Sequence, residues 1–209
     1  MSHLAGHRRA VFGGVIALGL LGLGARTAPA LHDDDMAMGD PTARVTVIEY
    51  ASVGCPHCAL WAKTVFPAFK KKYIDTGRVR FVFREMLTGQ ATLAAAGFLA
   101  ARCAGRARYF DVIDAIFRNQ EAILDAGDAF APLLRIDMAN GVTEDQFSAC
   151  MKAPSALKAL EARSDRNATD GKVTGTPTFV VGGRKLEGEQ SLADLDVAIA
   201  AARRRRSAR

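Results

Sequence analysis

Apolar residues gather in three short segments that predict β-strands. Residues 44–52 (RVTVIEYAS) open with alternating apolar positions, and residues 78–83 (RVRFVF) are rich in Val and Phe. Residues 178–188 (TFVVGGRKLEG) carry two glycines at their centre, which predicts a β-hairpin that turns at Gly182-Gly183. The chain therefore has strand signals near its beginning and its end.

Helical spacing of apolar residues fills the rest of the chain. Residues 56–73 predict a helix that Pro67 kinks. Residues 90–170 show no strand pattern and are rich in Ala, Leu and charged residues. They predict five short helices, and a final helix follows with Ser191 as its N-cap. The expected ranges are 90–104, 106–119, 128–139, 143–152, 155–169 and 191–202.

The order of these elements predicts an α/β fold with a mixed sheet. A strand, a helix and a second strand form a parallel pair with a right-handed crossover, and the closing hairpin adds antiparallel strands. We expect residues 44–88 and 171–202 to form this α/β domain. Residues 89–170 then form an inserted all-helical domain beside the sheet.

The first thirty residues have the layout of a secretory signal peptide. Arg8 and Arg9 precede an apolar stretch at residues 11–24, and the tripeptide APA ends at Ala30. Fourteen apolar residues are fewer than the roughly 20 that span a bilayer, which favours cleavage near Ala30 over an uncleaved anchor. We expect export to the periplasm by the Sec or the twin-arginine route, where disulfides persist.

Residues 31–43 show no apolar periodicity and predict a flexible linker. His32, Met36 and Met38 within it are ligands that suit a soft metal such as copper. A solvated linker explains the same residues, and we favour that interpretation.

Composition is that of an ordinary globular protein. The chain has 209 residues, 49% hydrophobic and 24% charged, which indicates one domain with an insertion. The net charge of +6 comes from the two ends. Residues 1–30 carry three arginines and no acid, and residues 203–209 carry five arginines, which leaves −2 on the body. The basic tail predicts a solvated, frayed segment, and nothing here indicates nucleic-acid binding.

The candidate chemistry is the tetrapeptide Cys55-Pro56-His57-Cys58 at the predicted junction of strand and helix. Cys55 would lie at the helix N-terminus, where free N–H groups and the dipole favour a thiolate. Pro56 suits the first helical position, and His57 adds a nearby cation when protonated. These features predict a lowered pKa at Cys55, with Cys58 one turn further in as the resolving thiol. Half a zinc site and a purely structural disulfide remain alternatives.

A second feature is Thr176-Pro177, just before the predicted hairpin. X-Pro bonds adopt the cis form more often than others, although trans is the ordinary expectation. The combination of CPHC after a strand, a kinked helix, a helical insertion and Thr-Pro before a hairpin resembles the DsbA family of periplasmic thiol–disulfide oxidoreductases. The resemblance covers nearly all of residues 41–202. It implies the thioredoxin fold, Cys55 as nucleophile, a cis-proline at Pro177 packed against the pair, and a Thr176 backbone that contacts substrate.

The resemblance also implies roles for residues outside the tetrapeptide. Glu49 matches a buried acid below the active site that relays a proton, often beside a basic partner, here Arg80 or Arg84; a half-exposed strand glutamate is the alternative. Relatives with a further disulfide suggest that Cys103 and Cys150 pair, and two unpaired thiols are the alternative. These last two residues form no second C-x-x-C that would complete a zinc site.

The sequence thus predicts a monomeric dithiol oxidase that donates the Cys55–Cys58 disulfide to reduced exported proteins. We expect no resident metal, no organic cofactor, and reoxidation by a DsbB-like quinone-linked membrane protein. A disulfide isomerase or reductase of the same superfamily is the alternative, because Thr before the cis-proline also occurs there. Isomerases usually carry an N-terminal oligomerisation module, for which residues 31–43 are too short. A copper-handling module that uses CPHC and His32 is a third candidate.

Overall fold

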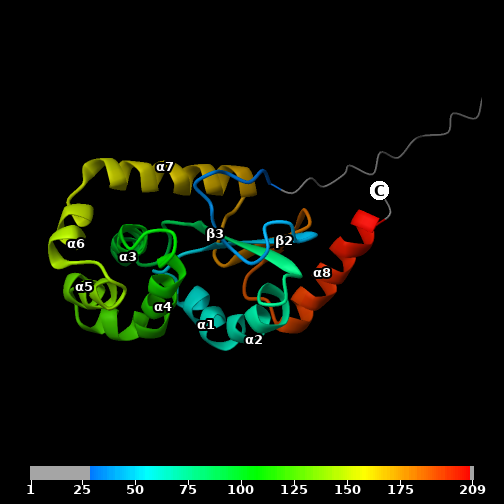
Figure 1. Cartoon of the computed structure of the whole chain (residues 1–209), viewed down its shortest axis with the longest axis horizontal. Helices are drawn as coiled ribbons and strands as arrows, with labels where there is room; N and C mark the ends of the chain where they lie inside the picture. Colours follow the sequence, from blue (N-terminus) through cyan, green and yellow to red (C-terminus); the bar gives the residue numbers. More distant parts are fainter. Residues whose placement is uncertain (1–28, 208–209) are drawn as a thin grey trace, which may run out of the picture.

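The computed structural model describes residues 29–207 and contains one mixed five-stranded sheet. The strand order is β1-β3-β2-β4-β5 (Figure 1). The predicted signal peptide lies outside the described residues, apart from its last two positions. The strands are β1 (Met36–Met38), β2 (Val45–Ala51), β3 (Val79–Glu85), β4 (Thr178–Val181) and β5 (Arg184–Glu187).

The central strands pair as the order of elements predicts. Strands β2 and β3 are parallel, and β4 runs antiparallel to β2 on its other side. The hairpin of β4 and β5 turns at Gly182-Gly183, where both glycines have positive φ. Glu49 in the middle of β2 therefore has Phe83 on one side and Phe179 on the other.

The helices follow the predicted positions closely. The predicted helix from Pro56 is broken at Val65, two residues before Pro67, which confirms the kink. Helix α4 extends six residues beyond its predicted end. The helices are α1 (Pro56–Thr64), α2 (Phe66–Phe69), the π-helical turn η1 (Lys70–Ile74), α3 (Ala91–Cys103), α4 (Tyr109–Asp125), α5 (Phe130–Ala139), α6 (Glu144–Met151), α7 (Pro154–Gly171) and α8 (Leu192–Ser207).

Helices cover the sheet on both faces. On one face, α1, α2, α8 and much of the insertion form the larger core, in which Phe83 contacts Phe98, Tyr109 and Phe117. On the other, a smaller apolar cluster packs against Ala168 of α7. Figure 1 shows α7 above the sheet and α1, α2 and α8 below it, with α5 and α6 at the far end. The arrangement is thioredoxin-like, with the predicted helical insertion.

A disulfide ties the insertion together. Cys103 at the end of α3 is bonded to Cys150 in α6, with Cα atoms 6.0 Å apart. The two cysteines are 47 positions apart in the sequence, and the segment between them includes α4 and α5, so the bond closes most of the helical insertion into one loop.

The expectation of a flexible linker at residues 31–43 is wrong. Met36–Met38 form β1, which pairs antiparallel with β3. Asp35 is buried and accepts hydrogen bonds from Arg84, and Asp34 accepts one from Arg166 of α7. These partners lie 49 and 132 residues away, so local patterning gave no sign of them.

The three candidate soft-metal ligands, His32, Met36 and Met38, have different surroundings. The His32 imidazole lies 2.8 Å from the Asp170 carboxylate, whereas Met36 is buried in the larger core. Met38 is partly buried against the same core. Each side chain therefore has a separate packing role, and this segment offers no assembled copper site.

The expectation of a frayed tail after residue 202 is also wrong for residues 203–207, which continue α8. Arg205 donates to the carbonyl oxygen of Gly182, and Arg206 donates to that of Arg44. Arginines at a helix C-terminus also interact favourably with the helix dipole, which stabilises this extension. Among residues 29–207, none of the helices is long and apolar enough to cross a membrane.

Candidate active site

The tetrapeptide lies where the sequence predicts, between the end of β2 and the start of α1. Cys55 is the N-cap residue with an extended backbone, and Pro56 occupies the start of the helix. No side chain caps this helix end, so the N–H groups of its first turn point toward the Cys55 sulfur. Both cysteines are free thiols; Cys55 is 6% exposed and Cys58 is fully buried.

The two thiols differ sharply in acidity. The pKa of Cys55 falls to about 5, chiefly because the Cys58 thiol donates a hydrogen bond to it. The Thr176 hydroxyl and the backbone N–H groups of His57 and Cys58 add to this effect, and burial opposes it. Burial raises the pKa of Cys58, as do the hydrogen bond to Cys55 and the nearby Glu49. The arrangement holds one thiolate and one protonated thiol.

The loop before β4 packs directly against the first cysteine. The Thr176-Pro177 peptide bond is cis, and the Thr176 carbonyl oxygen lies 3.4 Å from Cys55 Sγ. The Thr176 hydroxyl also bonds to that of Thr88 at 2.9 Å, which fixes the loop beside the residues that follow β3. The structure thus brings together the two sequence features that lie 121 residues apart.

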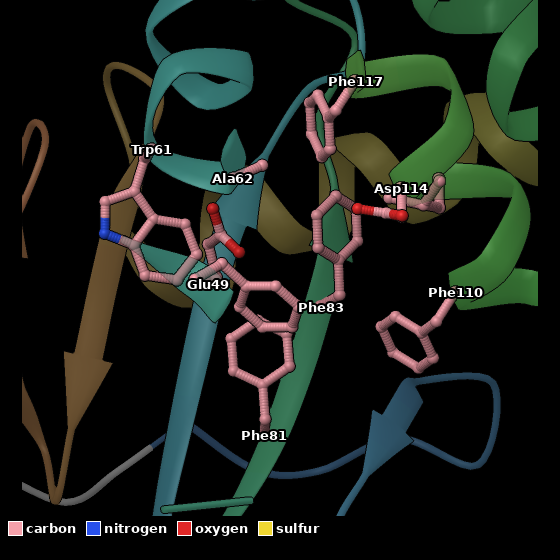
Figure 2. Close-up of a pocket in the computed structure, with 10 residues that line it drawn as sticks. Glu49, Trp61, Ala62, Phe81, Phe83, Phe110, Asp114 and Phe117 are labelled. Atoms are coloured by element: carbon pink, nitrogen blue, oxygen red, sulfur yellow. The ribbon is translucent and has the colours of Figure 1, made fainter. Parts of the chain in front are cut away.

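Glu49 lies in the protein interior. It is 2% exposed, and its Oε1 has no hydrogen-bond partner among the described residues. Figure 2 shows its carboxyl group between the rings of Trp61 and Phe83, with Asp114 farther out on α4. Burial raises the pKa of Glu49 well above its usual range, and the negative charge on Cys55 raises it further.

A cavity of about 30 Å³ adjoins this carboxyl group. That volume has room for a water molecule. Five phenylalanines and a tryptophan form most of its wall, and Glu49 and Asp114 are the ionisable residues among those that line it. Its lining residues are Glu49, Trp61, Ala62, Phe66, Phe81, Phe83, Phe110, Ile113, Asp114 and Phe117.

The expected basic partner of Glu49 is absent from the neighbouring strand. Glu49 is opposite Phe83, so strand alternation places Arg84 and Arg80 on the other face of the sheet. Arg84 is fully buried there and donates to Asp35 and to the Tyr50 hydroxyl. The expectation that one of these arginines pairs with Glu49 is therefore wrong.

His57 points away from the interior. Its side chain is 70% exposed, and Nδ1 lies 2.6 Å from Glu189 Oε1, in the segment after β5. The hydrogen bond and the charge of Glu189 raise the pKa of His57. The sequence indicated the histidine but not its carboxylate partner.

Sequence analysis missed two further residues of the site. Buried Gln120 of α4 donates from Nε2 to the carbonyl oxygens of Val53 and Cys55, and so holds the cysteine loop in place. A glutamine on the apolar face of an amphipathic helix is a signal that marks such a role. Glu189 gave no comparable signal, because its loop has no recognisable motif. Within residues 29–207, no cluster of three or more His, Cys, Asp or Glu side chains is arranged for a metal ion.

Comparison with known proteins assigns the family. The family model described as Thioredoxin matches residues 32–201, and the chain belongs to this family. A Rickettsia typhi protein, named as a protein-disulfide oxidoreductase, is 34% identical over 158 residues. The match includes 75% of this chain but only 58% of that relative, so this chain spans little more than half its length.

Solved structures place the fold among DsbA proteins. The crystal structure of Wolbachia pipientis alpha-DsbA1 has a TM-score of 0.74 and 25% identity, over 82% of this chain and 92% of that one. BdbD from Bacillus subtilis has a TM-score of 0.70 at 18% identity, over 84% and 96% of the two chains. The insertion and the thioredoxin-like sheet therefore occur together in DsbA structures, as the resemblance implied.

Proposed function

We propose that this protein is a protein-disulfide oxidoreductase that acts as a dithiol oxidase on exported proteins in the periplasm. The observation that carries the proposal is the difference between the two thiols. The Cys55 pKa falls to about 5, whereas that of Cys58 is raised. A stabilised thiolate favours the reduced enzyme, and so makes its disulfide a stronger oxidant.

The reaction begins on the oxidised enzyme. A substrate thiolate attacks Cys55 Sγ, which forms a mixed disulfide and breaks the Cys55–Cys58 bond. Cys58 leaves as a thiolate and takes up one proton. A second substrate thiolate then attacks the substrate sulfur of the mixed disulfide, and Cys55 leaves as a thiolate. The substrate loses two electrons and gains a disulfide; the enzyme gains the two electrons.

Glu49 is the proposed proton donor for Cys58. It is buried beneath the pair and interacts with Cys58 electrostatically, and its raised pKa favours the protonated form that can donate. The proton that it gives up is replaced from solvent, and the adjoining cavity has room for the water that this requires. In reoxidation the same carboxylate accepts the proton of Cys58.

We further propose the class of substrate and the reoxidant. The Thr176 backbone beside Cys55 suits an extended polypeptide, which matches a reduced exported protein as substrate. Reoxidation then falls to a DsbB-like quinone-linked membrane protein, and the enzyme works as a monomer after signal-peptide removal near Ala30. The chemistry uses sulfur and protons alone and requires no organic cofactor.

Equilibration of the Cys55–Cys58 pair against glutathione tests the direction of the reaction. We expect a potential near the roughly −120 mV of a strong oxidant; one near −270 mV would instead indicate a reductase. Cys55→Ser should abolish exchange, and Cys58→Ser should accumulate mixed disulfides through Cys55. A variant with both Cys103 and Cys150 changed to Ala is the control, and it should keep the potential of the wild type.

A further inference from the structure

A three-residue segment, Gly188–Gln190, contacts both halves of the candidate active site. The Gly188 N–H donates to the carbonyl oxygen of Pro177 at 2.9 Å. The indole N–H of Trp61, in α1, donates to the carbonyl oxygen of Gln190 at 2.9 Å. The segment therefore spans from the cis-proline loop to the helix that begins with CPHC.

Glu189, between these two anchors, extends its side chain to His57. The Oε1 to Nδ1 distance is 2.6 Å, and the carboxylate side chain is 37% exposed. Because backbone contacts hold the residues on either side of it, Glu189 is positioned before it meets the imidazole. The charged groups that act on His57 are Glu189 and the Cys55 sulfur. His57 thus lies between a fixed carboxylate and the candidate nucleophile.

We propose that Glu189 is a positioning residue for disulfide exchange, which holds the His57 ring in place beside Cys55 and favours its charged form. The inference rests on the proposed role of Cys55 as the attacked sulfur. Glu189 does not contact the reacting atoms, and it acts through His57.

The charge on His57 favours the thiolate form of Cys55 by linkage. The thiolate raises the pKa of His57, so a protonated His57 stabilises the thiolate to the same extent. Without Glu189 the largest contribution that raises the His57 pKa is lost, so the imidazole would lose its proton at a lower pH. Hydrogen bonds from Cys58, Thr176 and the backbone affect the Cys55 pKa more than the His57 charge does. Glu189 contacts the histidine rather than the sulfur, so its effect on Cys55 passes through the His57 ring.

The test is Glu189→Gln, with Glu187→Gln as the matched control. Glu187 lies two residues earlier and pairs with Lys185 at 2.8 Å, away from His57. In Glu189→Gln, we expect a lower His57 pKa by NMR titration. The thiolate absorbance of Cys55 and the equilibrium with glutathione should both show that the equilibrium constant for thiolate formation falls about two- to fivefold above pH 7. That decrease is the size expected for the loss of an exposed ion pair. Glu187→Gln should match the wild type, and Glu189→Asp should restore part of the effect.

A double-mutant cycle separates this role from a purely structural one. In the His57→Gln background, Glu189→Gln should leave the Cys55 pKa and the glutathione equilibrium unchanged. An equal effect with and without the histidine would overturn the inference, as would a His57 pKa that Glu189→Gln does not lower. The proposed function would fail independently of this inference if the wild-type enzyme exchanged no disulfide with a dithiol although its His57 titrated as expected.

Discussion

Two neighbouring strands each carry a buried glutamate, and the two have opposite surroundings. Glu85 at the end of β3 is 1% exposed and accepts hydrogen bonds from Arg102, Arg163 and Tyr109 at 2.7, 2.9 and 3.0 Å. Glu49 in β2 is 2% exposed, and its Oε1 has no partner among residues 29–207. One carboxylate is surrounded by cations, and the other by aromatic rings.

The helical insertion accounts for the difference. Arg102, Tyr109 and Arg163 belong to α3, α4 and α7, and all three meet at Glu85. The same insertion gives only apolar rings and a distant carboxylate to the cavity beside Glu49. A buried carboxylate with cationic partners joins elements together through its hydrogen bonds, whereas burial without such partners disfavours the charged form. Burial alone thus does not determine what a glutamate does.

The largest expected effect comes from removal of the charge at Glu85. Glu85→Gln leaves Arg102 and Arg163 without their carboxylate, and we expect a loss of about 3 kcal/mol of unfolding free energy. Urea unfolding at neutral pH measures this loss. A decrease below about 1 kcal/mol would show that the arginines find other partners, and the contrast between the two glutamates would weaken.

At Glu49, by contrast, we expect the substitution to raise the unfolding free energy. Glu49→Gln removes a group whose pKa is raised in the folded state above its unfolded value of about 4.3. Since the folded protein binds the extra proton, wild-type stability falls as pH rises above that value, and the variant lacks this decline. We expect a net gain of about 1–3 kcal/mol at neutral pH, because the variant avoids the linkage cost of the raised pKa while its buried amide keeps part of its own desolvation cost. The gain should be larger in the reduced enzyme, where the Cys55 thiolate adds to the effect.

That stability gain should accompany a loss of function. Because a glutamine cannot exchange a proton with Cys58, disulfide exchange by Glu49→Gln should be slower, and stopped-flow Trp61 fluorescence can follow it. Faster or unchanged exchange at all pH values would contradict the proposed proton transfer.

A third buried carboxylate, Asp137 in α5, extends the comparison into the insertion. It is fully buried, neither oxygen has a partner among the described residues, and burial raises its pKa to about 7. The folded state therefore binds the extra proton between about pH 4 and pH 7, and stability declines across this window as pH rises. Asp137→Asn should abolish that decline; because the buried amide keeps a desolvation cost of its own, we expect a net gain of about 1–2 kcal/mol above pH 7 in thermal or urea unfolding. A steeper decline in the variant would contradict the account.

The smallest effect is expected at an exposed ion pair. Asp75 lies 2.6 Å from Lys70, and both side chains are more than 40% exposed. Asp75→Asn should change the unfolding free energy by less than about 0.5 kcal/mol, because solvent screens such pairs. A loss comparable to that of Glu85→Gln would mean that burial is not what makes the Glu85 cluster strong.

Local pattern was enough to predict most of the secondary structure and the reactive cysteine pair. Strands β2, β3 and the hairpin, and every helix of the insertion, lie within a few residues of their predicted positions, because apolar spacing and Pro or Gly boundaries mark them. Strand alternation also places Arg84 and Glu49 on opposite faces of the sheet, but only when the register of β2 against β3 is known. Local pattern does not give that register, which is why the expected pairing of an arginine with Glu49 was wrong.

The failures share one cause, which is contact between residues far apart in the chain. Residues 31–43 look like a linker because the partners of Asp34 and Asp35 lie in α7 and β3. The extension of α8 depends on carbonyl groups of Arg44 and Gly182. In each case a polar, charge-rich segment is ordered by hydrogen-bond donors or acceptors that lie far from it in the sequence.

Sequence by itself determined that a cysteine, a proline, a histidine and a second cysteine begin a helix after a buried strand. That arrangement depends only on neighbours within one turn, where dipole and free N–H groups act. Tertiary structure decided how the surrounding groups are arranged: the Thr176 carbonyl beside Cys55, the burial of Glu49 among aromatic rings, and the Glu189 carboxylate on His57. Electrostatic and hydrogen-bond effects depend on distance in space, and folding brings these groups together from across the chain.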